Sequence, residues 1–171
     1  MRKRIETERF LLRPLAGEDA EAVFEWVSDP EVNKYMPYPR YTELEAVKKW
    51  IASIKPEQNE FAFVLKDTGK VIGSGSVRYD ADLGGFTFGY NVSRRYWGNG
   101  YATEAAKAMI SWARKELGVT EFVAVYADDN VASGNVIRKC GLTFSHHTTY
   151  SKFDGSATFP ASVYVGHFVK L

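Results

Sequence analysis

The chain has 171 residues, of which 45% are hydrophobic and 25% charged, values that are ordinary for a globular protein of one domain. The formal net charge is +1, from 22 Lys and Arg against 21 Asp and Glu, which argues against a nucleic-acid-binding protein that works through a broad basic surface. The single cysteine, Cys140, excludes an intramolecular disulfide and a cysteine-based zinc site. We therefore expect one domain over residues 1–171, with no bound metal.

The N-terminus is basic, but Ile5-Glu6-Thr7-Glu8 follows it, where a secretory signal would continue with an apolar run. No apolar run approaches the length of a membrane-spanning helix. The expected location is therefore the cytoplasm, with no membrane partner.

The first third of the chain is expected to hold one strand and two helices. Residues 9–14 form a short strand that ends at a proline, and residues 18–27 form an amphipathic helix that Asp29-Pro30 breaks. A proline-rich aromatic loop follows at 35–41. Thr42 is then predicted as the N-cap of a second helix, with Glu45 as its capping-box partner.

The centre of the chain is expected to form three strands and a long helix. Residues 60–65, 70–79 and 86–92 are strand-like and are separated by glycine-containing turns, which predicts an antiparallel meander. Residues 101–117 carry apolar side chains at helical spacing and are followed by Gly118, so they form the strongest predicted helix.

The last third is expected to hold a buried strand, a shorter helix and a hairpin, at 122–126, about 132–140 and 143–170 respectively. The hairpin turns near Asp154-Gly155. The whole order predicts an α+β fold, with a mixed, mostly antiparallel central sheet flanked by helices.

The stretch from Val92 to Glu104 joins a strand to the long helix through a Gly-x-Gly loop. Glycines let the backbone approach a ligand closely, and the first-turn N–H groups of a helix attract an anion. A tight turn is the alternative interpretation of Gly-x-Gly alone. NAD and ATP are disfavoured, because the third glycine of a dinucleotide-binding loop and the Gly-Lys-Ser/Thr of a P-loop are both missing.

Three segments together resemble one family. Arg95-x-x-Gly98-x-Gly100 resembles the acetyl-CoA signature of the GCN5-related N-acetyltransferase (GNAT) superfamily. The wider string 89–105 is similar to that of the RimJ/RimL-like ribosomal-protein N-terminal acetyltransferases. Residues 7–14 resemble the first strand of that subgroup, and residues 130–142 its second cofactor segment. The three matches occur in the family's order and cover most of the chain.

The resemblance implies a GNAT-like fold and transfer of an acetyl group from acetyl-CoA to a primary amine, by direct attack in a ternary complex. It implies that the strand ending at Val92 splays from its neighbour, so that its backbone pairs with pantetheine and an N–H near Val92 polarises the thioester carbonyl. An ordinary paired strand is the alternative. The cofactor-binding residues that the resemblance implies are Tyr90, Asn91, Val92, Arg95, Trp97, Gly98, Asn99, Gly100, Tyr101, Ala102, Thr103, Asn130 and Ser133. It also allows a homodimer.

The departing thiolate needs a proton donor or a stabilising hydrogen bond. Many family members carry a tyrosine seven places after the asparagine at 130, but this chain has Ile137 there. The RimJ/RimL-like branch has a serine three places after that asparagine, and Ser133 matches it. The alternative roles are an N-cap for Asn130 and a solvent-facing first-turn serine for Ser133.

The general base is not identified by the sequence. The subgroup commonly has a glutamate where this chain has Thr87. Candidate substitutes are Glu104, His146 and His147, although Glu104 is more simply a first-turn helix acid, and adjacent histidines on a strand face opposite ways.

Two other features have plain structural alternatives. Cys140 could be a nucleophile, but an ordinary residue at a helix end is the favoured interpretation. The aromatic loop 35–41 could line the acceptor pocket or simply pack on the sheet.

The sequence thus leaves three classes of function open. The leading one is an N-acetyltransferase that acts on a protein N-terminus, with small-molecule acetylation of the aminoglycoside or polyamine kind as its rival. The second is an acyl-CoA-binding sensor without turnover, which the absence of Tyr at 137 and Glu at 87 keeps open. The third, a nucleic-acid-binding module, fits poorly with a net charge near zero.

Overall fold

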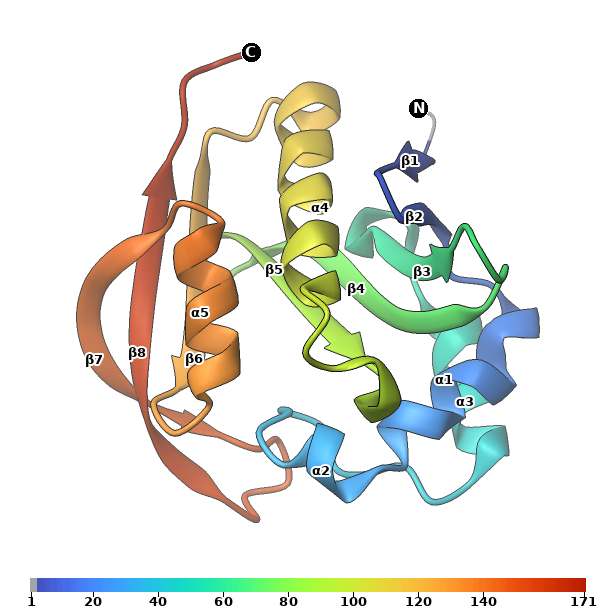
Figure 1. The fold of residues 1–171 in the computed structure, drawn as a ribbon. Coiled ribbons are helices and arrows are strands. Elements are labelled where there is room, and N and C mark those ends of the chain that lie inside the picture. Colours follow the sequence, from blue (N-terminus) through green and yellow to red (C-terminus); the bar gives the residue numbers. More distant parts are fainter. Residues whose placement is uncertain (1–2) are drawn as a thin grey trace.

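The computed structural model describes residues 3–171 and places eight strands in one sheet, in the order β1-β2-β3-β4-β5-β6-β8-β7 (Figure 1). The strands are β1 (Ile5–Glu6), β2 (Phe10–Pro14), β3 (Glu60–Leu65), β4 (Val71–Asp80), β5 (Gly85–Val92), β6 (Glu121–Ala127), β7 (Thr143–Ser151) and β8 (Thr158–His167). Neighbouring strands are antiparallel except β5 and β6, which are parallel. The α+β expectation and the predicted meander β3-β4-β5 are confirmed.

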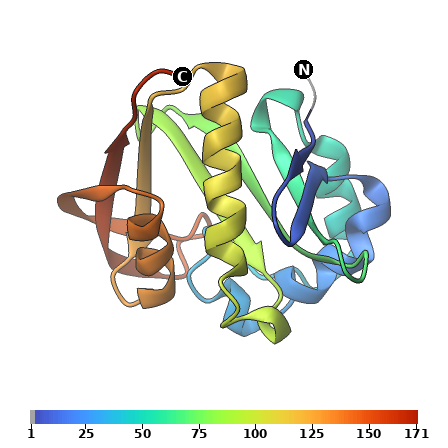
Figure 2. The same cartoon turned by 45° about the horizontal axis from the view of Figure 1, so that its top comes forward.

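Helices lie on both faces of this sheet. The α-helices are α1 (Ala20–Val27), α2 (Pro30–Asn33), α3 (Leu44–Ser53), α4 (Tyr101–Leu117) and α5 (Val131–Lys139), and the 3-10 helices are η1 (Gly17–Asp19), η2 (Pro56–Gln58) and η3 (Arg94–Tyr96). α4 and α5 lie on one face, and α1 and α3 lie on the other (Figures 1 and 2).

Two hydrophobic cores follow from this arrangement. The larger core packs α4 and α5 on the sheet and includes Phe63, Phe88 and Met109. The smaller core packs α1 against α3 and includes Trp26 and Val47. Strand residues therefore alternate between the two faces, and β5 turns Phe88, Tyr90 and Val92 toward the larger core.

One local expectation is wrong, and a second is confirmed with an addition. Thr42 does not cap the second helix, because Glu43 is still extended (φ −136°, ψ 135°) and occupies the N-cap position without a capping side-chain bond. Asp29-Pro30 ends α1 but also begins α2: the Asp29 carboxylate accepts a hydrogen bond from the Glu31 amide at 2.9 Å, and Pro30 stands at the first helical turn, where its fixed φ suits a helix.

The tip of the β7–β8 hairpin is hydrogen-bonded to the end of α2 and to the loop that follows it. The Lys152 Nζ donates to the carbonyl oxygens of Asn33 and Met36 at 2.8 Å each, and the Phe153 amide donates to the Pro37 carbonyl at 2.8 Å. The aromatic loop thus forms one wall at the ends of β5 and β6, and the hairpin tip forms the adjoining wall. Within residues 3–171, no helix is long and apolar enough to cross a bilayer.

Candidate active site

Strands β5 and β6 diverge after one pair of residues. Phe86 pairs with Phe122, and from there to Val92 the two strands form no further ladder. The Ser93 amide donates to the Ile72 carbonyl of β4 at 2.8 Å, so the antiparallel pattern turns the backbone N–H and C=O of Val92 away from β4 and into the gap. The predicted splay is present, with peptide groups directed into it.

A helix N-terminus faces the same gap. Gly98 and Gly100 have φ of +80° and +76°, the left-handed region that favours glycine, and α4 begins directly afterwards at Tyr101. Gly100 is the N-cap, so no side chain caps the first-turn amides of this 17-residue helix. Uncapped amides at the positive end of a long helix form an anion site, which fits a pyrophosphate.

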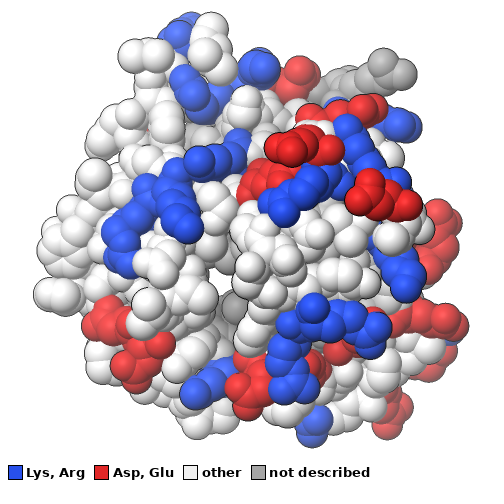
Figure 3. Space-filling view, in the orientation of Figure 1, with Lys and Arg blue, Asp and Glu red and all other residues white. Residues whose placement is uncertain are grey.

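The surface is hollowed between these elements. The space-filling view shows a hollow between α5 and the segment that leads into α4, with Lys and Arg side chains on both sides (Figure 3). Arg94 and Arg95 lie on η3, in the segment that leads into α4, and Arg138 and Lys139 lie in the last turn of α5. Their charge would complement a phosphorylated ligand.

The other residues of the loop are partly engaged within the protein. Arg95 Nε pairs with the Glu25 carboxylate at 2.8 Å, and its side chain remains 66% exposed. Trp97 Nε1 donates to the Val92 carbonyl at 2.8 Å, and the Asn99 side-chain amide donates to the Tyr96 carbonyl at 3.0 Å. Because Trp97 occupies the Val92 carbonyl, the Val92 N–H is the group of this residue that is directed into the gap.

Arg9 and Glu104 brace the loop. Glu104 accepts from the Thr7 hydroxyl at 2.7 Å, from the Arg9 amide at 2.9 Å and from Arg9 Nε at 2.6 Å. Arg9 Nη1 also donates to the Asn99 carbonyl at 2.8 Å. Burial alone would raise the pKa of Glu104, but these donors lower it, so Glu104 remains an anion bound to Arg9 and is unsuited to be the base.

Replacing Arg9 with alanine is expected to weaken acetyl-CoA binding about tenfold, since a charge-assisted bond that shapes the loop contributes roughly 1.5 kcal/mol. Calorimetric titration with acetyl-CoA measures this. The matched control is Arg4→Ala, which removes an exposed arginine 3.8 Å from Glu6. An unchanged Kd in folded Arg9→Ala would show that the loop keeps its shape without the brace.

Ser133 faces β5 and not bulk solvent alone. The Tyr90 hydroxyl lies 3.0 Å from Ser133 Oγ, and the Asn130 side chain accepts from the Ser133 amide at 3.3 Å, so Asn130 is also the N-cap of α5. Burial raises the pKa of the Tyr90 hydroxyl, which therefore stays protonated. Tyr90 was expected to act through its backbone; only the fold reveals that its hydroxyl reaches Ser133.

Cys140 and Ile137 take no part in this arrangement. Both are buried in the larger core. Burial raises the pKa of the Cys140 thiol to about 11, which leaves very little nucleophilic thiolate at neutral pH. The structural interpretation of Cys140 is therefore favoured.

The two histidines lie on β7, away from the gap. His146 Nδ1 is 2.9 Å from Ser145 Oγ, and His147 Nδ1 is 3.5 Å from Ser162 Oγ. His146 lines an open groove of about 530 Å³ along β6, β8 and β7, and His147 does not, which agrees with the expected opposite facing. Neither is hydrogen-bonded to the β5 residues. In residues 3–171, no group of three or more His, Cys, Asp or Glu is placed to hold a metal ion.

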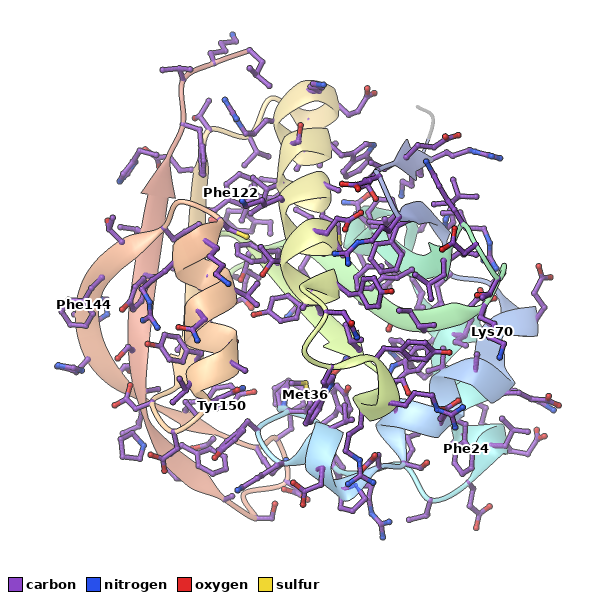
Figure 4. The ribbon with its side chains drawn as sticks, viewed as in Figure 1. Phe24, Met36, Lys70, Phe122, Phe144 and Tyr150 are labelled. Carbon is purple, nitrogen blue, oxygen red and sulfur yellow. The ribbon has the colours of Figure 1, made fainter. Side chains whose placement is uncertain are left out.

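The aromatic loop does lie at the end of the gap. Asn91 Nδ2 donates to the Tyr38 hydroxyl at 2.9 Å, and Tyr35 packs on Phe159 of β8 with ring centroids 5.4 Å apart. Figure 4 shows Tyr150 and Met36 below the ends of β5 and β6, where the hairpin and the loop meet.

Known proteins give the same picture. Residues 9–143 match the family model of the acetyltransferase (GNAT) domain. The chain is 32% identical over 133 residues to the uncharacterized N-acetyltransferase p20 of Bacillus licheniformis, covering 74% of this chain and 75% of that protein. It is 31% identical over 166 residues to the FsC-acetyl coenzyme A-N(2)-transacetylase of Aspergillus fumigatus, covering 88% and 68%.

Among solved structures, the fold is similar to that of RimL, a ribosomal L7/L12 alpha-N-protein acetyltransferase in complex with coenzyme A. The TM-score is 0.83 with 16% identity, over 96% of this chain and 98% of that one. This likeness concerns the fold, and it is consistent with the RimJ/RimL-like resemblance of the motifs. The chain belongs to the GNAT acetyltransferase family and is an acyltransferase that uses acetyl-CoA.

Proposed function

We propose that the protein transfers the acetyl group of acetyl-CoA to a primary amine by direct attack within a ternary complex. The observation that carries this is the β5–β6 gap, into which the Val92 N–H is directed, with the Ser133 hydroxyl 3.0 Å from the hydroxyl of Tyr90 on the same strand. The pyrophosphate is assigned to residues 98–103, and the pantetheine arm to the backbone of Tyr90–Val92 with Asn130 on the far wall.

Each end of the reacting thioester then has a partner. The Val92 N–H would polarise the carbonyl oxygen and stabilise the charge that develops on it. As the C–N bond forms and the C–S bond breaks, the Ser133 hydroxyl would donate to the departing sulfur. The Tyr90 hydroxyl, protonated because it is buried, would hold the Ser133 hydroxyl in place through the hydrogen bond between them.

The acceptor is proposed to be a protein N-terminus. The groove along β6, β8 and β7 is open and runs from the turn at Asp82 to Tyr150, a shape that suits an extended chain. Asp82 and Glu121 are the carboxylates that line it, so it is not the strongly acidic site that a polycation would favour. The relative named for N(2)-acetyl transfer also supports a nitrogen acceptor.

An amine screen tests this function. Acetyl-CoA is incubated with a lysine-free peptide bearing a free α-amino group, spermidine and an aminoglycoside, and both CoA thiol release and the acetylated product are measured. We expect the peptide to be acetylated fastest. Acetyl-CoA binding without transfer to any of the amines would instead favour the sensor.

Ser133→Ala is expected to lower kcat about 10- to 100-fold with little change in the Kd of acetyl-CoA, because the hydroxyl acts chiefly on the departing sulfur. Tyr90→Phe should lower kcat less, and the double variant should resemble Ser133→Ala, since Tyr90 acts through Ser133. Steady-state kinetics measure all three. Ser53→Ala, at the exposed end of α3, is the control. A wild-type kcat in Ser133→Ala would contradict the role.

A further inference from the structure

The sheet face opposite α4 forms a polar floor beside the gap. Since Phe88 and Tyr90 point toward α4 and α5, the intervening residues Thr87, Gly89 and Asn91 point to the other face. Ser74 and Ser76 of β4 lie beside them in register and are 3% and 5% exposed.

Glu60 stands at the edge of this floor. In register, Glu60 pairs with Ser76, and Ser76 pairs with Gly89, so the three form one row across β3, β4 and β5. A Cβ at Gly89 would meet nothing within 4 Å, so the space above Gly89 is open, whereas a Cβ at Gly75 would strike Gly89 O at 2.5 Å. With strands about 4.8 Å apart, the Glu60 backbone is roughly 10 Å from Gly89, a span that a glutamate side chain and one water can fill.

Tyrosine hydroxyls lie near this row. Tyr38 is hydrogen-bonded to Asn91 and is close enough to Glu60, Tyr41 and Tyr150 that their charges raise its pKa further, after burial. Asn91 Oδ1 is buried without a hydrogen-bond partner among residues 3–171, so one acceptor atom there is left for an N–H group. Tyr38 thus lies between Asn91 of β5 and Tyr150, which lines the groove.

Glu60 has no cation bound to it. Among residues 3–171, no Lys, Arg or His nitrogen lies within 4.0 Å of its carboxylate, and the Arg78 guanidinium pairs instead with Asp80 at 3.5 Å. Burial raises the pKa of Glu60 to about 7, while Arg78 and the Ser76 hydroxyl favour its ionised form. A carboxylate that is only partly exposed and exchanges its proton near neutral pH is suited to general-base work.

We propose that Glu60 accepts the proton of the acceptor ammonium through one water held at Ser76. It would take the place of the glutamate that the subgroup commonly has at the position of Thr87. This rests on the proposed transferase function. The ammonium N–H bond breaks and its proton passes to the Glu60 carboxylate. The nitrogen lone pair forms the C–N bond, and the C–S bond breaks. The nitrogen loses its second proton as the amide forms, and the thiolate takes up one proton through the Ser133 hydroxyl, which regains a proton in the same exchange. Glu60 then releases the proton to solvent.

Two amines of different basicity test this role. With a lysine-free peptide, whose α-amino group has a pKa of about 8, and an alkyl monoamine, of pKa about 10, the wild-type kcat/KM should rise through pH 7 and level off for both. In Glu60→Gln, only amine already neutral in solution can react, so the midpoint should move to the pKa of each amine. At pH 7 the loss should be about 10-fold for the peptide and about 1,000-fold for the monoamine. Glu57→Gln, an exposed position on η2, should behave as wild type.

Side-chain carboxyl NMR of ¹³C-glutamate-labelled protein, without acceptor, gives an independent readout. The resonance missing from Glu60→Gln should titrate near pH 7, and a midpoint near 4.5 would overturn the assignment. An equal loss for both amines, or unchanged profiles with acetyl-CoA bound normally, would do so as well. Wild-type protein that binds acetyl-CoA but acetylates neither amine would overturn the transferase function itself.

Discussion

Gly100→Trp is expected to abolish the thermal stabilisation that acetyl-CoA gives the wild-type protein. At a ligand concentration 100 times its Kd, binding to the native state adds about 2.7 kcal/mol, which for a chain of this size raises Tm by about 5–10 °C. An indole at Gly100 would stand at the N-terminus of α4, where the uncapped amides are assigned to the pyrophosphate. We expect the Kd to rise at least 100-fold.

The control for backbone strain lies at the other end of the same helix. Gly118 also has a left-handed φ, +68°, and open space around it, so Gly118→Trp carries a similar conformational cost of about 1–2 kcal/mol without touching the loop. Scanning both variants with and without acetyl-CoA separates strain from lost binding. If folded Gly100→Trp is stabilised as strongly as Gly118→Trp, the pyrophosphate lies elsewhere.

The loop was predictable because its information is local. Positive φ at Gly98 and Gly100 and the start of α4 involve adjacent residues, so the sequence pattern and the geometry coincide. The same holds for the N-cap role of Asn130, three residues before the amide that it accepts from. The Thr42 cap failed for an equally local reason: an extended Glu43 shifts the helix start by one residue, a difference that the sequence pattern does not resolve.

The base could not be predicted, because its setting is made by distant segments. Glu60 is one of many glutamates in the sequence, and it differs from them only where β3, β4, the aromatic loop and β7 meet. Glu104 seemed a candidate until the fold brought Thr7 and Arg9 onto it. Thr87 indicated that the glutamate of the subgroup is missing from β5. Glu60 lies on β3, outside any sequence motif, so the sequence pattern could not identify it.

The ionised form of the buried Glu60 carboxyl should be costly to the fold, and Glu60→Gln should therefore stabilise the protein above pH 7 while it impairs catalysis. A rise in the pKa of Glu60 from 4.5 to about 7, at 1.36 kcal/mol for each pH unit, amounts to about 3 kcal/mol. The sign follows from proton binding. Between pH 4.5 and 7 the folded protein holds this proton more tightly than the unfolded chain does, so the wild type loses this stability as the pH rises, and glutamine does not.

Urea unfolding at pH 4.5 and pH 8 checks this. The difference between Glu60→Gln and wild type should grow by about 2–3 kcal/mol from the lower pH to the higher, because the variant carries no ionisable group there. Glu57→Gln is exposed and should show no such growth. Asp19 and Glu104, whose pKa values are lowered by Arg13 and by Thr7 and Arg9, titrate alike in all three proteins and cancel. A difference in the free energy of unfolding between Glu60→Gln and wild type that does not change with pH would mean that Glu60 ionises at little cost. Its pKa would then be ordinary, and Glu60 would not be suited to act as the base near neutral pH.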